Sequence, residues 1–304
     1  MYARGLASPG GLAPSPFPAQ DRGPEQGADY TDGPSGHTMV LANFERQIHP
    51  IVVAHRGASA AYPENTLPSF RGAVQAGADV VELDVRLTAD NVLVILHDLD
   101  VSLTTDGVGF VHTLALDEVK RLDASSGRGP RTEVPTLGEA LELLSGRAGI
   151  DIEIKNLPGE PSFDSPREAA ALEVVRLLRE TGFDGTVLVS SFNWLSIERI
   201  QELDPDIPTG FLTTAGVDPW AALTYAKAHG HAYVLPQVPA IHVAGEDFVK
   251  AAHADGVFVG TWTVDDPEAI ERLFEMGVDA VATNDPAMAV PIRDRFRNRQ
   301  TRQL

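Results

Sequence analysis

Eight short segments rich in valine, isoleucine and aromatic residues recur along the chain after residue 50, and stretches with helical periodicity separate most of them. Such alternation of strand and helix patterns is typical of a parallel sheet whose strands are connected by helices. The predicted strands cover residues 51–55, 80–87, 149–155, 186–192, 209–214, 232–237, 257–264 and 280–284. Because eight parallel strands close a TIM (β/α)8 barrel, we predict this α/β fold. An open, doubly wound sheet fits the same apolar pattern and is the alternative.

One further apolar segment, residues 91–98, follows the second predicted strand after only three residues. A crossover helix does not fit in so short a connection, whereas a hairpin does. We therefore predict that this segment returns antiparallel to the second strand and stays outside the barrel. Residues from about 99 to 135 then form a small insertion on the rim, after the second barrel strand. Helices are predicted over residues 66–77, 136–146, 165–182, 193–203 and 266–277.

The first 38 residues are dense in glycine, proline, alanine and serine, and they show no hydrophobic periodicity. They also lack the apolar core of a signal peptide. We predict a disordered leader over residues 1–45 and one barrel domain over residues 46–298. Met39 opens the first apolar stretch and is an alternative start of the natural protein. No apolar run is long enough for a membrane span, so we expect a cytoplasmic protein without stable membrane insertion.

Acidic residues outnumber basic ones, 43 to 24, which gives a formal net charge of −19. Such a chain repels phosphate backbones and anionic lipid surfaces, so nucleic acid is not an expected partner. The chain contains no cysteine, which excludes disulfides, thiolate metal sites and a cysteine nucleophile. Any bound metal must therefore be held by aspartate, glutamate or histidine.

The predicted strands end in polar side chains, at the edge where TIM barrels place their active sites. These strand-end residues are His55, Arg56, Glu82, Asp84, Glu153 and Lys155. Because strand side chains alternate between faces, residues two apart point the same way, and the three carboxylates face one barrel mouth. They repel one another unless a cation neutralises them. All-oxygen ligation favours one divalent ion, Mg²⁺ or Ca²⁺, and salt bridges to Arg56 or Lys155 are the alternative.

Two histidines stand apart from the other seven because each ends an apolar run near the carboxylates. His55 ends the first strand, and His97 lies on the returning hairpin segment. Two imidazoles that titrate near neutrality can act as general base and general acid, although a packed or surface imidazole is the alternative for each. Arg56 and Lys155 add cationic groups suited to phosphate oxygens. Since no protein nucleophile accompanies them, these residues predict a phosphoryl-transfer site.

Five short motifs follow one another along the chain and carry these residues. They read "AHRG" (54–57), "YPENT" (62–66), "VELDV" (81–85), "LHD" (96–98) and "IEIK" (152–155). In this order and spacing, they resemble the glycerophosphodiester phosphodiesterase family. Three later segments extend the likeness over nearly everything after residue 50, namely 190–193, 260–264 and 277–286.

The resemblance implies a metal-dependent hydrolysis of small glycerophosphodiesters to glycerol 3-phosphate and an alcohol. It implies that Glu82, Asp84 and Glu153 bind the metal and that His55 and His97 provide acid and base catalysis. Contacts to phosphate or substrate are implied for Arg56, Lys155, Glu64, Phe192 and Trp262. Without a protein nucleophile, either water or the 2-hydroxyl of the glycerol attacks the phosphate. Attack by the 2-hydroxyl from within the substrate needs no second molecule to be positioned, so a cyclic phosphate is the expected intermediate.

Three positions depart from the usual family pattern. Leu103 stands where arginine is common, Asp265 where asparagine is common, and Asn284 in a run that often reads I-T-D. None belongs to the expected catalytic set, so the departures bear on substrate preference. A lysophospholipase D-like activity on acylated substrates and a catalytically silent binding module remain alternatives. The sequence leaves the head group, the choice of metal and the oligomeric state open.

Overall fold

The computed structural model describes residues 50–302 of the chain, and the predicted leader over residues 1–45 lies outside this range. Eight parallel strands form a closed barrel, because β1 pairs with β9 on one side and with β2 on the other. The barrel strands are β1 (Ile51–Ala54), β2 (Val80–Leu87), β4 (Gly149–Ile154), β5 (Val187–Ser191), β6 (Thr209–Thr213), β7 (Tyr233–Pro236), β8 (Phe258–Thr261) and β9 (Ala280–Thr283). This closure confirms the predicted TIM barrel and excludes the open sheet.

Strand β3 (Leu93–Ile95) pairs antiparallel with β2, with Leu87 opposite Leu93. It lies beyond β2 at the edge of the pairing order, outside the closed ring of eight. The chain then forms two short 3-10 helices and one short helix, η2 (Val101–Leu103), η3 (Val111–Thr113) and α2 (Leu116–Val119). This region buries a small apolar cluster of its own, which includes Val101, Val111 and Val119. The insertion therefore has a local core separate from that of the barrel.

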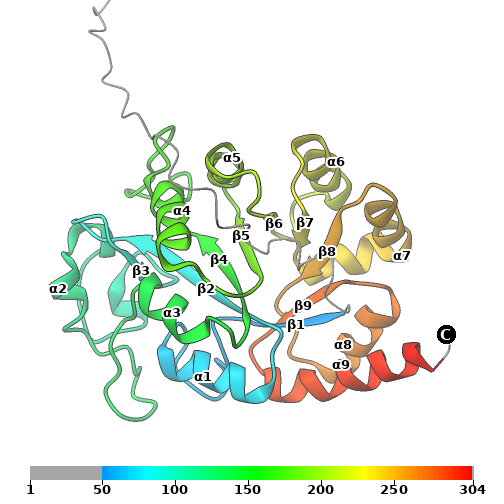
Figure 1. Ribbon diagram of the computed structural model, residues 1–304, viewed down its shortest axis with the longest axis horizontal. Helices are drawn as coiled ribbons and strands as arrows, with labels where there is room; N and C mark the ends of the chain where they lie inside the picture. The colour runs from blue at the N-terminus through cyan, green and yellow to red at the C-terminus, as the bar shows by residue number, and fades with distance from the viewer. Residues whose placement is uncertain (1–49, 303–304) are drawn as a thin grey trace, which may run out of the picture. The chain divides into compact units, whose positions relative to one another are not determined.

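Helices follow the barrel strands and surround them in Figure 1. They are α1 (Leu67–Ala76), α3 (Leu137–Leu144), α4 (Ala169–Thr181), α5 (Trp194–Leu203), α6 (Pro219–His229), α7 (Val238–Ala254), α8 (Pro267–Glu275) and α9 (Pro286–Thr301). Side-chain caps begin several of them, as where Thr136 and Glu139 form a capping box at α3. Arg293 of α9 forms an ion pair of 2.6 Å with Asp79, which precedes β2. The last helix is thereby joined to the N-terminal end of the second barrel strand.

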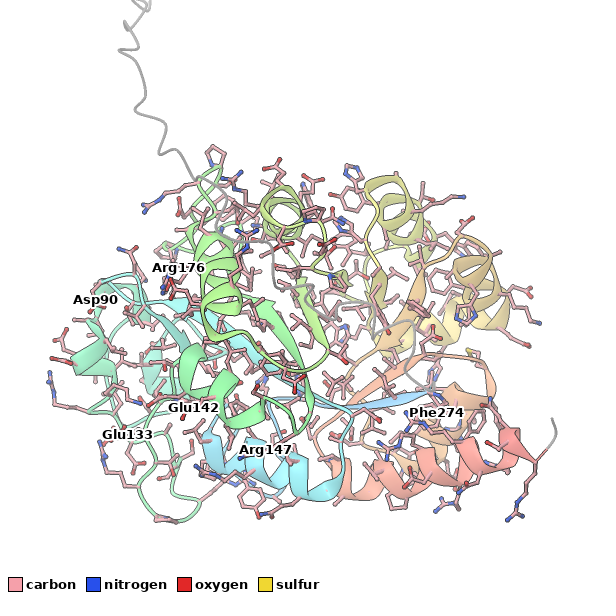
Figure 2. All side chains as sticks on the ribbon, in the orientation of Figure 1. Asp90, Glu133, Glu142, Arg147, Arg176 and Phe274 are labelled. Carbon is pink, nitrogen blue, oxygen red and sulfur yellow. The ribbon has the colours of Figure 1, made fainter. Side chains whose placement is uncertain are left out.

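Alternation along the strands separates two environments. On β2 and β4 the apolar residues Val81, Leu83 and Ile152 are fully buried in the core shared with the surrounding helices. The residues between them face the barrel interior. On the outer layer, Glu142 of α3 and Arg176 of α4 are exposed, whereas other residues of the same helices pack inward (Figure 2). Among residues 50–302, no helix is long and apolar enough to cross a membrane.

Candidate active site

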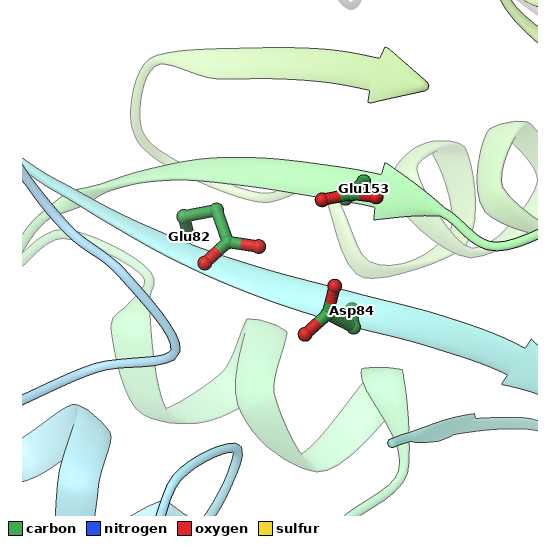
Figure 3. A group of neighbouring side chains, drawn as sticks. All are labelled: Glu82, Asp84 and Glu153. Carbon is green, nitrogen blue, oxygen red and sulfur yellow. The ribbon is translucent and has the colours of Figure 1, made fainter. Parts of the chain in front are cut away.

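Three carboxylates meet inside the barrel near the C-terminal ends of its strands. Glu82 and Asp84 project from β2 and Glu153 from the neighbouring β4 (Figure 3). The pairing register places Asp84 opposite Glu153, so alternation along two adjacent strands brings the three side chains together. One ligand atom from each lies within 4.8 Å of the others, and all three residues are buried. The arrangement is the one expected from the E-x-D and E-I-K patterns.

Two cationic side chains contact these carboxylates. Arg56 follows β1, and its backbone N–H donates to Glu82 Oε2 at 2.7 Å while its Nε lies 3.2 Å from Asp84 Oδ2. Its Nη1 donates to Glu64 Oε1 at 2.9 Å, which explains how Glu64 joins the site. Lys155 Nζ lies 3.0 Å from Asp84 Oδ1 and donates to Glu153 Oε1. The salt bridges raised as an alternative to a metal are therefore present, and the cluster still contains more acidic than basic groups.

Burial and mutual repulsion shift the titration of the cluster. Burial raises the pKa of Glu82 well above its usual range, and the nearby carboxylates raise it further. Burial also raises the pKa of Glu153 to about 7, against the opposite effect of Lys155. For Asp84 the effect of burial is outweighed by Lys155 and Arg56, so the pKa of this carboxyl lies below its usual range. The site thus stabilises bound protons or an additional cation.

The donor set fits a hard divalent cation. Glu82 Oε1 is buried and, among residues 50–302, has no hydrogen-bond partner. A buried carboxylate oxygen without a partner is energetically unfavourable, and a metal ion would satisfy it. The convergent donors are carboxylate oxygens, the ligands preferred by Mg²⁺ and Ca²⁺. The cluster is therefore able to hold one such ion.

Two histidines line the same cavity from different segments. His55 follows β1, and its Nδ1 lies 2.8 Å from Asn284 Oδ1. His97 follows β3, and its Nδ1 lies 3.0 Å from Asp98 Oδ1. Arg86 on β2 anchors this second segment by donating from Nε to the carbonyl oxygen of His97 at 2.8 Å. Burial lowers the pKa of both imidazoles, with Arg56 adding to the effect at His55 and Lys155 at His97.

The cavity has a volume of about 160 Å³ and continues from the charged groups into the apolar barrel interior. Phe192 and Trp262 line it and pack edge to face, with ring centroids 5.4 Å apart. The Lys155 ammonium group lies 5.6 Å from the centroid of the Phe192 ring. Trp262 Nε1 donates to the carbonyl oxygen of Leu235 at 2.9 Å, which holds the indole in place. All ten residues expected at the site thus lie in the cavity wall or in direct contact with it.

Sequence reasoning missed three polar residues of this region, namely Asn65, Asp151 and Ser190. Asn65 donates from Nδ2 to Asp84 Oδ2 at 2.7 Å, and Asp151 accepts a hydrogen bond of 2.8 Å from Ser190 Oγ. Burial raises the pKa of Asp151 to about 7. Alternation could have identified Asp151, because it lies two residues before Glu153 on the same face of β4. Asn65 lies in the YPENT motif (62–66), but no local pattern connects it with Asp84.

The fold and the site together define a TIM-barrel protein with an acidic centre, able to hold a metal ion, at the C-terminal ends of its strands. Residues 55–288 match the model of the Glycerophosphoryl diester phosphodiesterase family. A glycerophosphodiester phosphodiesterase of Caldanaerobacter subterraneus subsp. tengcongensis is 36% identical over 242 residues, which cover 78% of this chain and 94% of the relative. The chain therefore belongs to the glycerophosphodiester phosphodiesterase family, whose members are phosphoric diester hydrolases.

Solved structures agree with this assignment. A phosphodiesterase of Oleispira antarctica, in complex with the product sn-glycerol-3-phosphate, is similar with a TM-score of 0.74 and 31% identity, covering 84% of this chain and 99% of that chain. A glycerophosphodiester phosphodiesterase of Thermotoga maritima gives a TM-score of 0.65 at 26% identity, covering 81% of this chain and 100% of that chain. The resemblance inferred from the motifs is thus confirmed.

Proposed function

We propose that this protein hydrolyses glycerophosphodiesters to glycerol 3-phosphate and an alcohol. The observation that carries the proposal is the convergence of three buried carboxylates, two histidines and two cationic side chains on one cavity. The family assignment supports the reaction class, and the product bound to the Oleispira antarctica phosphodiesterase is the product expected here. A catalytically silent barrel gains no support, because every residue of the expected set is present at the cavity.

Glu82, Asp84 and Glu153 are the proposed ligands of one divalent ion, Mg²⁺ or Ca²⁺. When bound, such an ion supplies positive charge that neutralises the carboxylates and stabilises the charge on a reacting phosphate. Arg56 offers planar N–H donors to a non-bridging phosphate oxygen, and Lys155 offers a point charge beside it. Both cations already lie at the cavity, so a phosphate entering it meets donors that are held in place by their acidic partners.

The two histidines divide the proton transfers. His55 removes the proton from the 2-hydroxyl of the glycerol, whose oxygen forms a bond to phosphorus while the bond from phosphorus to the head-group oxygen breaks. His97 donates a proton to that departing oxygen, which leaves a cyclic 1,2-phosphate. Water then opens the ring with the two roles exchanged. Burial lowers the pKa of both imidazoles, which keeps His55 in the neutral form that a base requires. At His97 the negative charge of a bound phosphodiester opposes this lowering and favours the protonated form that an acid requires.

A second candidate is a lysophospholipase D-like activity on acylated substrates. The insertion exposes Leu103 and Val108, at 66% and 86% of their surfaces, and such apolar groups suit an acyl chain. Arg128 of the insertion donates to the carbonyl oxygens of Ser59 and Ala60, so the insertion contacts the loop that follows His55. This contact joins the Arg128 end of the insertion to the loop that follows His55, a residue of the cavity wall.

An activity panel tests both candidates. The purified protein is incubated with glycerophosphodiesters of several head groups and with lysophospholipids, in the presence of Mg²⁺, Ca²⁺ or a chelator. We expect turnover of the glycerophosphodiesters with a divalent ion. Turnover of the lysophospholipids alone would favour the second candidate, and no turnover of any diester under any condition would contradict both.

A substrate analogue tests the cyclic route. Replacing the 2-hydroxyl of the glycerol by hydrogen removes the internal nucleophile and leaves the phosphodiester unchanged. We expect turnover of this analogue to fall at least about 1000-fold, because the high effective molarity of the internal group is lost. Turnover at the normal rate would instead make water the nucleophile of the first step.

A further inference from the structure

The side-chain amide of Asn284 contacts the Nδ1 edge of the His55 imidazole, and Asn284 itself does not line the cavity. Its Oδ1 is 2.8 Å from His55 Nδ1 and 2.9 Å from Ser59 Oγ. Pairing of the first and last barrel strands brings the two residues together, since the backbone N–H of His55 donates to the carbonyl oxygen of Thr283 at 2.9 Å. The contact is thus determined by the closure of the barrel and joins residues that are 229 positions apart.

Asp265 determines which way this amide points. Its Oδ2 accepts from Asn284 Nδ2 at 2.6 Å, and its Oδ1 accepts from the backbone N–H of Asn284 at 2.8 Å and from Thr283 Oγ1 at 2.9 Å. A carboxylate only accepts hydrogen bonds, so the NH₂ group of the amide must face Asp265. The carbonyl oxygen of the amide must then face His55, and this oxygen can only accept as well.

We propose that Asn284, oriented by Asp265, is a positioning residue that selects the Nδ1–H tautomer of His55 and leaves Nε2 as the basic nitrogen. A ring nitrogen 2.8 Å from an obligate acceptor carries the proton, and the other ring nitrogen of the neutral imidazole then carries the lone pair. The inference rests on the proposed function of His55 as general base and names the atom that accepts the proton. Asn284 itself does not touch the substrate in this scheme.

The charges around His55 explain why a neutral partner matters. Arg56 and Glu64 face it from the loop after β1, and Asp84 faces it from β2, whereas the partner on the β9 side is the uncharged Asn284. An amide orients the ring without the stabilisation of the imidazolium that a carboxylate at the same distance would provide. His55 therefore remains neutral, and competent as a base, at lower pH than it would beside an aspartate.

The first test observes the tautomer directly. Long-range ¹H–¹⁵N NMR spectra of the histidine side chains are recorded on the full-length protein above the pH at which His55 titrates, and a His55→Gln variant identifies the signal. We expect Nδ1–H in the wild type and a shift toward Nε2–H in Asn284→Ala. An Nε2–H tautomer in the wild type, or an unchanged tautomer in Asn284→Ala, overturns the proposal. Because this measurement needs no turnover, it is independent of whether glycerophosphodiesters are the substrate.

The second test exchanges the two side chains. Asn284→Ala should lower kcat roughly 10- to 100-fold with little change in KM, because part of the general-base contribution is lost while phosphate binding remains. The double exchange Asn284→Asp with Asp265→Asn keeps a hydrogen-bonded pair but places the charge beside His55. It should recover most of kcat and move the acidic limb of the kcat/KM profile upward by roughly one pH unit.

Two further variants serve as controls for the exchange. Asn284→Asp alone sets two carboxylates against each other and should recover less of kcat than the double exchange. Glu268→Gln removes a charge from the exposed start of α8 and should leave the profile unchanged. Thermal unfolding of each variant verifies that it is folded. An unshifted acidic limb in a folded double exchange, or an unchanged kcat in Asn284→Ala, overturns the proposal.

Discussion

The cavity at the barrel mouth has two walls of different chemistry. Every charged or imidazole side chain that lines it comes from the segment between His55 and Lys155. The wall contributed by β5 to β9 is uncharged and presents apolar and aromatic side chains, among them Phe192, Tyr233 and Trp262. The first wall can therefore transfer protons and bind a phosphate. The second wall can only shape the space that the substrate occupies and exclude water from it.

The difference between the walls has a physical basis in mutual stabilisation. Buried charges are tolerated when they are paired, and in the first wall Asp84 pairs with Arg56 and Lys155 while Glu153 pairs with Lys155. The apolar wall opposite them lowers the local dielectric and so strengthens each of these interactions. We therefore expect substitutions on the charged wall to reduce kcat, and substitutions on the uncharged wall to change KM and the choice of head group.

Removal of the divalent ion should have the largest effect. Chelation should lower turnover at least about 1000-fold, because the carboxylate cluster then lacks the charge that it needs beside a phosphate. Adding back Mg²⁺ or Ca²⁺ should restore turnover, and Glu153→Gln should weaken metal binding measured by titration calorimetry. Glu142→Gln, on the outer face of α3, is the matched control and should bind metal normally. Full activity in excess chelator would contradict the metal site.

Loss of the proposed general acid should have the second-largest effect on turnover. His97→Ala should lower kcat roughly 100- to 10,000-fold on natural head groups, because the departing alcohol is no longer protonated. A nitrophenol leaving group needs no proton, so the variant should recover much of its rate on such a substrate. His242→Ala, an exposed histidine of α7, provides the control. An equal loss on both classes of substrate would assign His97 another role.

The charge geometry of the same wall is tested by Arg56→Lys. This change keeps the positive charge but loses the planar group that contacts both Glu64 and Asp84. We expect kcat/KM to fall roughly 10- to 1000-fold, by analogy with the loss of one donor to a developing oxyanion. Arg176→Lys, on the surface of α4, should have no effect. If Arg56→Lys retained full kcat/KM, the residue would serve only in structural ion pairs.

The uncharged wall should respond differently. Phe192→Leu keeps an apolar side chain but loses the aromatic contacts with Trp262 and with the Lys155 ammonium group. We expect the relative kcat/KM for two head groups to change up to about 10-fold while kcat on the preferred substrate stays nearly constant. Competition assays with paired substrates measure this ratio. A large loss of kcat without a change in selectivity would contradict the proposed difference between the roles of the two walls.

Asp151 tests the cost of burying a charge on this wall. The expected effect is smaller, and it is measured as a change in folding stability. Burial, with Ser190 opposing and Glu153 adding to it, raises the pKa of Asp151 to about 7. Since this folded-state pKa exceeds the unfolded one of about 3.9, the protonated form is favoured on folding, and stability falls as pH rises toward 7. The neutral Asp151→Asn can keep the hydrogen bond from Ser190. In chelator, its advantage over the wild type should grow by on the order of 2 kcal/mol between pH 5 and 8.

Thermal unfolding at the two pH values measures this difference. The gap in Tm between Asp151→Asn and the wild type should widen by roughly 4 °C from pH 5 to pH 8. Asp255→Asn, which removes a carboxylate that follows α7, is the control and should show no such widening. A constant gap would mean that Asp151 is charged throughout this range.

Local patterns predicted much of the fold and of the charged wall. The eight strands and the facing of Glu82, Asp84 and Glu153 follow from alternation within each strand, a property of neighbouring residues. Strand ends were less accurate. Residues 257–264 were predicted as one strand, whereas β8 ends at Thr261, because the chain must leave the barrel there to reach α8. Likewise, β3 spans only Leu93–Ile95, the part that pairs with β2.

The sequence by itself determined the two periodicities, the strand-end motifs and the charges they carry, because each depends on residues close together in the chain. Only the tertiary structure decided which of these groups meet. The contact of Asn65 with Asp84, and that of His55 with Asn284, depend on the register of paired strands and on closure of the barrel. Closure joins segments across the whole chain, and no local preference of either residue encodes the identity of a partner 229 positions away.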